Sequence, residues 1–191
     1  YRLYSYLLRT PASGAKAPAA RSGVNHGITK PAPTPGYGIG SYTLVSFTDH
    51  DGRPTGGIGL CPTSILPGSP LERAGFRRGD IIAEVDGKTP TESTYAAIFT
   101  SLLSPADGAE VELTRNEADA RPVRVAAERL DPTPIIRAEV LDGTQVGYIV
   151  YESFDAAYDD DLLDAVKRLR EEGITDLVLD LRNNGGGHVI S

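Results

Sequence analysis

An apolar segment that runs directly into a glycine-rich turn constrains this chain more than any other feature. Residues 177–181 read Leu-Val-Leu-Asp-Leu, and residues 182–187 read Arg-Asn-Asn-Gly-Gly-Gly. A short apolar run bounded by turn residues predicts a strand covered on both faces. The glycines tolerate positive φ and lack Cβ atoms, so backbone N–H groups can approach a ligand closely. Such a turn at the carboxyl end of a parallel strand predicts a ligand-binding or anion-stabilising site.

Composition narrows the classes of protein to which the chain can belong. The 191 residues carry a formal net charge of −7, which argues against nucleic-acid binding. No apolar run approaches the roughly 20 residues of a membrane-spanning helix. The sequence contains no methionine, so we expect a partial or processed form from which any export signal has been removed.

The middle of the chain, residues 36–128, has the pattern of one small domain. Ser69 before Pro70 predicts the start of a short helix, and Asp86-Gly87 predicts a tight hairpin turn. Pro62 lies within a strand pattern, which suggests an edge strand or a bulge. The strands are expected at 42–47, 58–66, 81–85, 110–115 and 122–127, with an amphipathic helix at 93–103.

The flanking segments differ from this middle part. Residues 1–35 are expected to hold the remnant of a structured element followed by a flexible linker rich in Ala, Pro, Gly and Ser. Residues 129–191 begin at a proline-rich boundary and continue as strand 146–154, helix 159–172 and strand 175–182. An intervening helix predicts a parallel crossover between the two strands.

Two parts of the chain resemble known families. Residues 65–82 read Ile-Leu-Pro-Gly-Ser-Pro-Leu-Glu-Arg-Ala-Gly-Phe-Arg-Arg-Gly-Asp-Ile-Ile, and with residues 37–40 they resemble a PDZ domain of the bacterial, circularly permuted type. Residues 146–151 and 179–187 look like the start of the catalytic core of the C-terminal processing peptidases, or tail-specific proteases. The resemblance implies an α+β chain: a PDZ domain, built as a small β-barrel or sandwich with two helices, and then the first βαβ unit of an α/β peptidase core.

The peptidase resemblance implies a serine nucleophile and a lysine general base, neither of which matches any part of this chain. The glycine turn would supply one oxyanion donor, a role that falls on Gly186 or Gly187. Asp180 and Arg182 would hold the loop, and Gly185 replaces the proline or serine usual in the family. The resemblance implies no cofactor and no metal. The chain by itself is expected to bind peptides and to cut none.

The PDZ resemblance implies partners that are proteins or peptides with free C-termini. A peptide would add as a strand beside residues 41–47, with its carboxylate in a nest of N–H groups and an apolar terminal side chain against a helix. A second Gly-Ile-Gly-Leu, at residues 57–60, is the alternative position for the nest. The predicted peptide-binding residues are Tyr37, Gly38, Ile39 and Gly40 for the nest and Tyr95, Ile98 and Phe99 for the helix.

Other interpretations of these features remain open. The alternative function is a non-catalytic PDZ scaffold whose peptidase core is degenerate. His188 follows the turn but is expected to be structural or exposed to solvent, and Ser191 matches no nucleophile pattern. The acidic run at residues 159–161 is explained by the dipole of a helix start better than by a metal site. By resemblance, the protein is expected to be exported to the periplasm or cell envelope of a bacterium; the oligomeric state is not readable.

Overall fold

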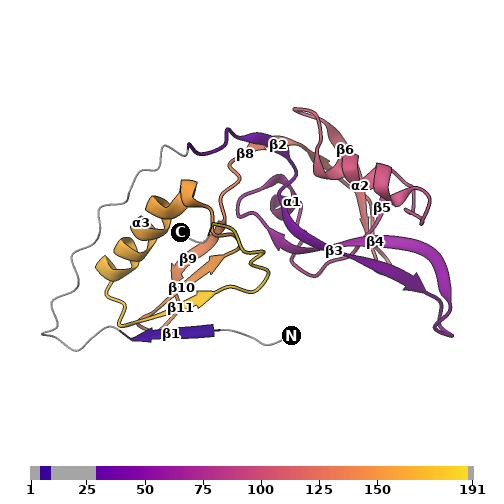
Figure 1. Cartoon of the computed structure of the whole chain (residues 1–191). Helices are drawn as coiled ribbons and strands as arrows, with labels where there is room; N and C mark the ends of the chain where they lie inside the picture. Colours follow the sequence, from indigo (N-terminus) through magenta and orange to yellow (C-terminus); the bar gives the residue numbers. More distant parts are fainter. Residues whose placement is uncertain (1–4, 10–28, 189–191) are drawn as a thin grey trace, which may run out of the picture. The chain divides into compact units, whose positions relative to one another are not determined.

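The computed structural model describes residues 5–9 and 29–188 of the chain. These residues form two compact units, coloured along the sequence in Figure 1. The middle unit is Ala32–Pro132. The terminal unit joins a strand near the N-terminus to the residues from Thr133 onward.

The middle unit is built on a five-stranded antiparallel sheet with the order β3-β4-β5-β6-β7. A separate antiparallel pair, β2 with β8, brings the two ends of the unit together. The strands are β2 (Thr34–Gly36), β3 (Ile39–Thr48), β4 (Pro54–Ile65), β5 (Ile82–Val85), β6 (Glu110–Arg115), β7 (Val123–Ala126) and β8 (Glu128–Leu130), and the helices are α1 (Pro70–Arg73) and α2 (Tyr95–Leu103).

Local sequence signals explain several of these elements. Ser69 caps α1 by accepting a hydrogen bond from the Glu72 N–H, and Pro70 occupies the first turn, as predicted. Asp86 and Gly87 both have positive φ, 52° and 69°, as a tight type I′ turn requires. The core of the unit consists of Tyr37, Leu60, Leu71, Phe76, Ile82, Val85, Phe99, Leu102, Val111, Leu113, Val125 and Ala127.

The prediction for Pro62 was right about the bulge and wrong about the edge. Ser41 pairs with Ser64 and Tyr42 with Pro62, so Thr63 is an extra residue on β4. However, β4 lies between β3 and β5, and the edge strands of the sheet are β3 and β7. The bulge lets a proline lie within a paired strand.

The terminal unit is a four-stranded mixed sheet, ordered β1-β11-β10-β9, with one long helix. The central pair β10 and β11 is parallel and is joined through α3, so the predicted crossover is confirmed. β1 pairs antiparallel with β11, and β9 pairs antiparallel with β10. The elements are β1 (Ser5–Arg9), β9 (Ile135–Val140), β10 (Val146–Tyr151), the 3-10 turn η1 (Ala156–Tyr158), α3 (Asp159–Glu171) and β11 (Asp176–Asp180).

α3 packs on one face of this sheet. Leu169 of α3 is fully buried against Ile149 and Tyr151 of β10, with Leu177 and Leu179 of β11 around them. The expectation that residues 177–181 form a strand covered on both faces was wrong for the described residues. Leu177, Val178 and Leu179 are only half-buried: Leu177 and Leu179 point to the face that packs on α3, and Val178 points to the opposite face.

Candidate functional site

The chain turns sharply as it leaves β11. The Asn184 N–H donates to the Leu181 carbonyl at an N···O distance of 3.0 Å, and Asn183 has a positive φ of 67°. The Asn184 side chain donates to the Tyr151 carbonyl at the end of β10, over 2.9 Å. The turn is therefore tied to both central strands.

Gly187 lies against the segment that follows β10. The Phe154 N–H donates to the Gly186 carbonyl over 2.9 Å, and the His188 N–H donates to the Phe154 carbonyl over 2.7 Å. A Cβ atom on Gly187 would overlap the Phe154 backbone, and the φ of 145° is itself one that side chains rarely allow. Only glycine fits at this position.

The three glycines of the turn differ in what their N–H groups do. The Gly185 N–H donates to the Glu152 carbonyl over 3.1 Å, and the Gly186 N–H donates to Asn184 Oδ1 over 2.8 Å. The Gly187 N–H donates to no acceptor among the described residues, and the residue is exposed. An exposed N–H in a turn that is held by hydrogen bonds can donate to a ligand in place of water.

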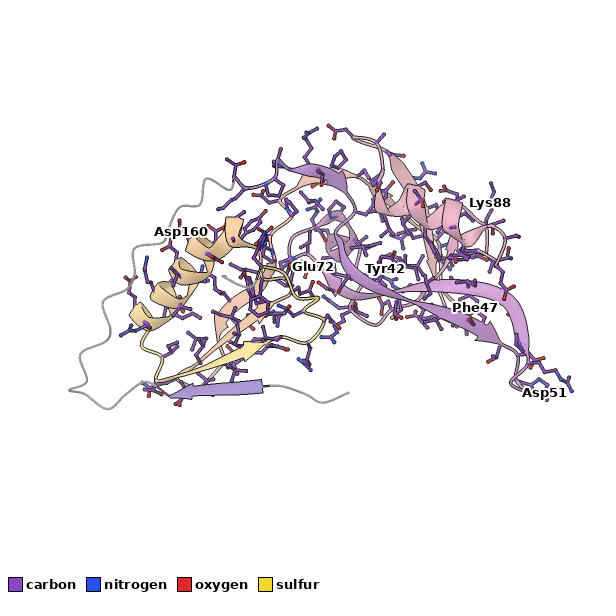
Figure 2. All side chains as sticks on the ribbon, in the orientation of Figure 1. Tyr42, Phe47, Asp51, Glu72, Lys88 and Asp160 are labelled. Atoms are coloured by element: carbon purple, nitrogen blue, oxygen red, sulfur yellow. The ribbon has the colours of Figure 1, made fainter. Side chains whose placement is uncertain are left out.

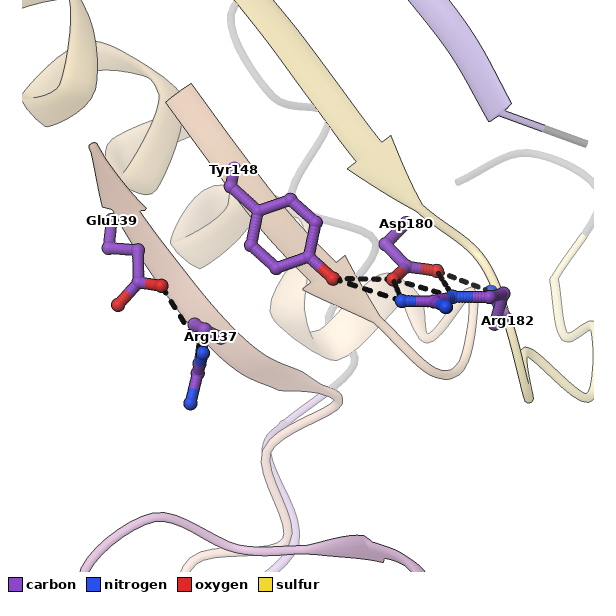
Figure 3. Close-up of polar contacts among 5 residues, drawn as sticks. All are labelled: Arg137, Glu139, Tyr148, Asp180 and Arg182. Atoms are coloured by element: carbon purple, nitrogen blue, oxygen red, sulfur yellow. Dashed lines mark hydrogen bonds and ion pairs between the residues drawn. The ribbon is translucent and has the colours of Figure 1, made fainter. Parts of the chain in front are cut away.

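The last residue of β11, Asp180, has a buried carboxylate (Figure 3). Asp180 is only 7% exposed. Its Oδ1 accepts from the Arg182 N–H and Nε over 2.9 Å each. Its Oδ2 accepts from Arg182 Nη2 and from the Tyr148 hydroxyl, each at a donor–acceptor distance of 2.5 Å. The carboxylate thus fixes the backbone two residues into the turn.

Electrostatics in this cluster follow from these hydrogen bonds. The hydrogen bonds from Arg182 lower the pKa of Asp180 to about 2, against the opposing effect of burial. Burial, followed by the hydrogen bond to Asp180, raises the pKa of Tyr148. Asp180 is therefore ionised at neutral pH and Tyr148 is a neutral donor.

A second candidate surface lies in the middle unit, at the edge strand β3. Tyr42 and Leu44 are 45% and 42% exposed, although their cross-strand partners Pro62 and Leu60 are buried in the core. Opposite residues of an antiparallel pair point to the same face, so Tyr42 and Leu44 lie on the core face where it reaches the edge of the sheet. Figure 2 labels Tyr42 on β3.

The comparisons with known proteins agree with the two units. The model of peptidase family S41 matches residues 145–191, and the model of the PDZ domain matches residues 63–114. "Carboxyl-terminal-processing peptidase 2, chloroplastic" of Arabidopsis thaliana is 33% identical over 147 residues, which cover 73% of this chain and 28% of that protein. The chain belongs to peptidase family S41 and carries a PDZ domain.

Two further proteins are similar to most of the chain. A "Probable CtpA-like serine protease" of Staphylococcus aureus strain COL is 32% identical over 126 residues, covering 65% of this S41 chain and 25% of that protein. The solved photosystem II D1 C-terminal processing protease has a TM-score of 0.51 at 23% identity, over 79% of this chain and 41% of its own, and supports the fold. The S41 chain spans about a quarter of the length of the curated relatives it matches.

The predicted peptide-binding residues of the PDZ domain lie in different environments. Tyr95 and Ile98 of α2 are half-buried beside the core, whereas Phe99 is only 4% exposed and belongs to the core itself. Tyr37 is also buried, and its hydroxyl donates to the Ala109 carbonyl over 3.2 Å. Within the loop 37–40, the carbonyls of Tyr37 and Gly38 accept from the N–H groups of Leu71 and Leu66 over 2.9 Å each.

The second Gly-Ile-Gly-Leu motif, at residues 57–60, lies inside β4 and has a packing explanation. A Cβ on Gly57 or Gly59 would come within 2.7 Å of the Phe47 ring. These glycines make room for an aromatic side chain on the neighbouring strand.

The sequence analysis did not single out four residues of these sites. Tyr42 and Leu44 fall in a strand pattern that gives no sign of their exposure. The role of Asn184 depends on a carbonyl of β10, and that of Tyr148 on its reach to Asp180. For Tyr148 the sequence offers one signal, an aromatic residue on the strand before the crossover. The spacing along the chain does not show that its partner is Asp180.

The His188 side chain has a structural role, since its Nδ1 accepts a hydrogen bond from the Ala156 N–H at an N···N distance of 3.4 Å. Among residues 5–9 and 29–188, no group of three or more His, Cys, Asp or Glu side chains could hold a metal ion. The acidic run 159–161 forms the first turn of α3. No helix in the described part of the chain is long and apolar enough to cross a membrane.

Gly38 offers a stability prediction for the PDZ domain. A Cβ on Gly38 would overlap the side chain of Ser69, and its φ is 104°. We expect Gly38→Ala to lower the free energy of unfolding by about 2 kcal/mol. Adding Ser69→Gly should restore part of this loss, because glycine is a tolerable N-cap. Urea denaturation of the four chains of this double-mutant cycle measures the coupling. Equal costs of Gly38→Ala with and without Ser69 would contradict the packing explanation.

Proposed function

We propose that the protein to which this chain belongs is a serine peptidase that binds polypeptides by their C-terminal ends and hydrolyses a peptide bond. The observation that carries the proposal is the exposed, unused N–H of Gly187 in a turn held by both central strands. Acyl transfer requires fixed donors for the oxyanion, and one such donor contributes about 10²–10³ to kcat. S41 membership supplies the reaction type.

The serine and the lysine base of the family are proposed to follow residue 191 in the whole protein. The serine hydroxyl would add to the substrate carbonyl carbon while its proton passes to the neutral lysine amine. The carbonyl oxygen then carries the negative charge, and the Gly187 N–H donates to it. When the tetrahedral intermediate collapses, the C–N bond breaks and the lysine returns the proton to the leaving amine. Water then adds to the acyl-enzyme, giving its proton to the lysine, and the serine leaves as it regains that proton.

The peptidase proposal is tested by comparing residues 1–191 with the protein extended past Ser191. We expect cleavage of a polypeptide substrate by the extended protein alone, and loss of that cleavage when the serine is replaced by alanine. Turnover by purified residues 1–191, or an extension without a serine–lysine pair, would contradict the proposal. In the second case the non-catalytic PDZ scaffold becomes the better description.

The PDZ domain is proposed to take up the substrate tail. Within the described residues β3 has a strand on one side only, so an extended peptide can pair with its other side. Tyr42 and Leu44 of β3, with Tyr95 and Ile98 of α2, flank the same core and offer apolar contact to a peptide side chain. The loop 37–40 is proposed to hold the terminal carboxylate through its N–H groups.

Leu44→Ser should weaken the binding of a peptide that ends in an apolar residue and a free carboxylate by about tenfold, because an apolar contact is lost. Thr43→Ala is the matched control, since Thr43 is the exposed neighbour whose side chain points to the other face of the strand. Calorimetry with free and amidated peptides measures both effects. Equal affinity for the two peptides would overturn the carboxylate assignment, and equal affinity of the Leu44→Ser and Thr43→Ala chains would overturn the β3 site.

Export to a bacterial periplasm or cell envelope is proposed from the family resemblance. Fractionation of the producing cells, followed by immunodetection of the protein, tests it. Recovery with the cytoplasmic fraction would be the contrary result.

A further inference from the structure

We propose that Tyr148 is a positioning residue for the glycine turn: by holding the Asp180 carboxylate, its hydroxyl fixes the start of the turn, and together with the hydrogen bond from the Phe154 N–H to the Gly186 carbonyl it sets the direction in which the Gly187 N–H points. The use of that N–H in catalysis rests on the proposed function. The positioning itself concerns the described residues and can be tested without turnover.

The tyrosine reaches Asp180 diagonally across the sheet. In the β10–β11 register, Tyr148 is opposite Val178 and Asp180 is opposite Val150. The Tyr148 side chain therefore extends toward the carboxyl end of the strands, and its hydroxyl meets Asp180 Oδ2 at 2.5 Å (Figure 3). Because Tyr148 lies on a central strand with partners on both sides, it is a fixed reference for the carboxylate.

The other side-chain donor to Asp180 is not fixed in the same way. Arg182 belongs to the turn itself, and its side chain is half exposed at 52%. A donor that moves with the turn cannot determine where the turn lies. Tyr148 is the side chain that connects the Asp180 carboxylate to the neighbouring strand.

A continuous set of hydrogen bonds leads from this carboxylate to Gly187. Asp180 Oδ1 accepts from the Arg182 N–H and fixes the first bend after β11. Leu181 then accepts from the Asn184 N–H, and Asn184 Oδ1 accepts from the Gly186 N–H. The peptide group that follows Gly186 carries the Gly187 N–H. Fixed side chains around a donor are what give it a fixed direction.

The test compares two changes of tyrosine to phenylalanine on the same strand. Tyr148→Phe removes the hydroxyl that donates to Asp180, whereas Tyr151→Phe removes a buried hydroxyl with no hydrogen-bond partner among the described residues. Amide NMR of 15N-labelled residues 1–191 follows the signals of Arg182 and Gly187. We expect Tyr148→Phe to shift the Gly187 amide signal and to reduce the exchange protection of the Arg182 amide by roughly tenfold. Tyr151→Phe should change neither.

Unchanged Arg182 and Gly187 signals in Tyr148→Phe would overturn the inference. Because phenylalanine keeps the packing of the ring, failure of Tyr148→Phe to fold would also overturn the inference: the hydroxyl would then be needed by the whole terminal unit and not by the turn. In the extended peptidase, Tyr148→Phe should lower kcat by about tenfold and leave KM unchanged. A shifted Gly187 signal in an extended protein that proves inactive would leave the positioning intact and reject only the proposed function.

Discussion

Replacing Gly187 with alanine is expected to lower the free energy of unfolding of the terminal unit by at least about 3 kcal/mol. The new Cβ would overlap the Phe154 backbone, which cannot move without breaking its hydrogen bonds to Gly186 and His188. Gly185→Ala should have almost no effect, since its Cβ would meet nothing within 4 Å. Gly186→Ala should fall between them at about 1 kcal/mol, because its space is open but its φ is 95°.

Hydrogen exchange of β10 and β11 at increasing urea concentration measures these three costs for the terminal unit alone. The order 185, 186, 187 is the informative outcome, because the same substitution is made at three consecutive positions. A Gly187→Ala chain as stable as Gly185→Ala would mean that the turn can leave Phe154 freely. The unused N–H would then be a feature of a flexible loop.

Asp180→Asn is expected to cost the terminal unit about 3 kcal/mol, because the amide leaves Arg182 and Tyr148 without their charged acceptor. Asp164→Asn is the control in the same unit. Asp164 pairs with Lys167, and both side chains are largely exposed, so the cost should be below about 0.5 kcal/mol. Comparable costs for the two variants would show that the buried carboxylate is not a structural anchor.

The same carboxylate predicts a dependence of stability on pH. The pKa of Asp180 falls from 3.8 to about 2 on folding, so the folded state binds its proton less readily than the unfolded state. Its contribution, about 2 kcal/mol, is complete above pH 4 and is lost as the pH falls from 4 toward 2. Urea denaturation between pH 2 and 6 should show this loss in the native chain, and Asp180→Asn should remove that part of the dependence. Parallel curves for the two chains would contradict the assignment.

Elements encoded by neighbouring residues could be predicted from the sequence. α1 begins where Ser69 and Pro70 indicate, and the parallel crossover follows from a strand–helix–strand pattern. β9 (Ile135–Val140) was not predicted: its residues alternate apolar and polar from Ile136 onward, but the prolines before it indicate a boundary. The short pair β2 and β8 depends on residues about 90 positions apart and leaves no local pattern.

The candidate site also has features that local sequence predicts and features that depend on the fold. The glycine turn is visible in the sequence because positive φ and close approach demand glycine. Which of the three N–H groups stays unused depends on Glu152 and Asn184, and therefore on the fold. The exposure of Leu44 likewise depends on β3 being the edge strand, which pairing between distant residues decides.

The pairing of β1 with β11 has a consequence for the order in which the protein assembles during synthesis. Ser5 pairs with Asp180, so the first described strand must wait until β11 has been made. The PDZ domain, whose sheet draws its strands from residues 39–126, can fold earlier. At about 5–20 residues per second, the interval between the two events lasts several seconds. The PDZ domain is then complete before the ribosome has delivered the glycine turn.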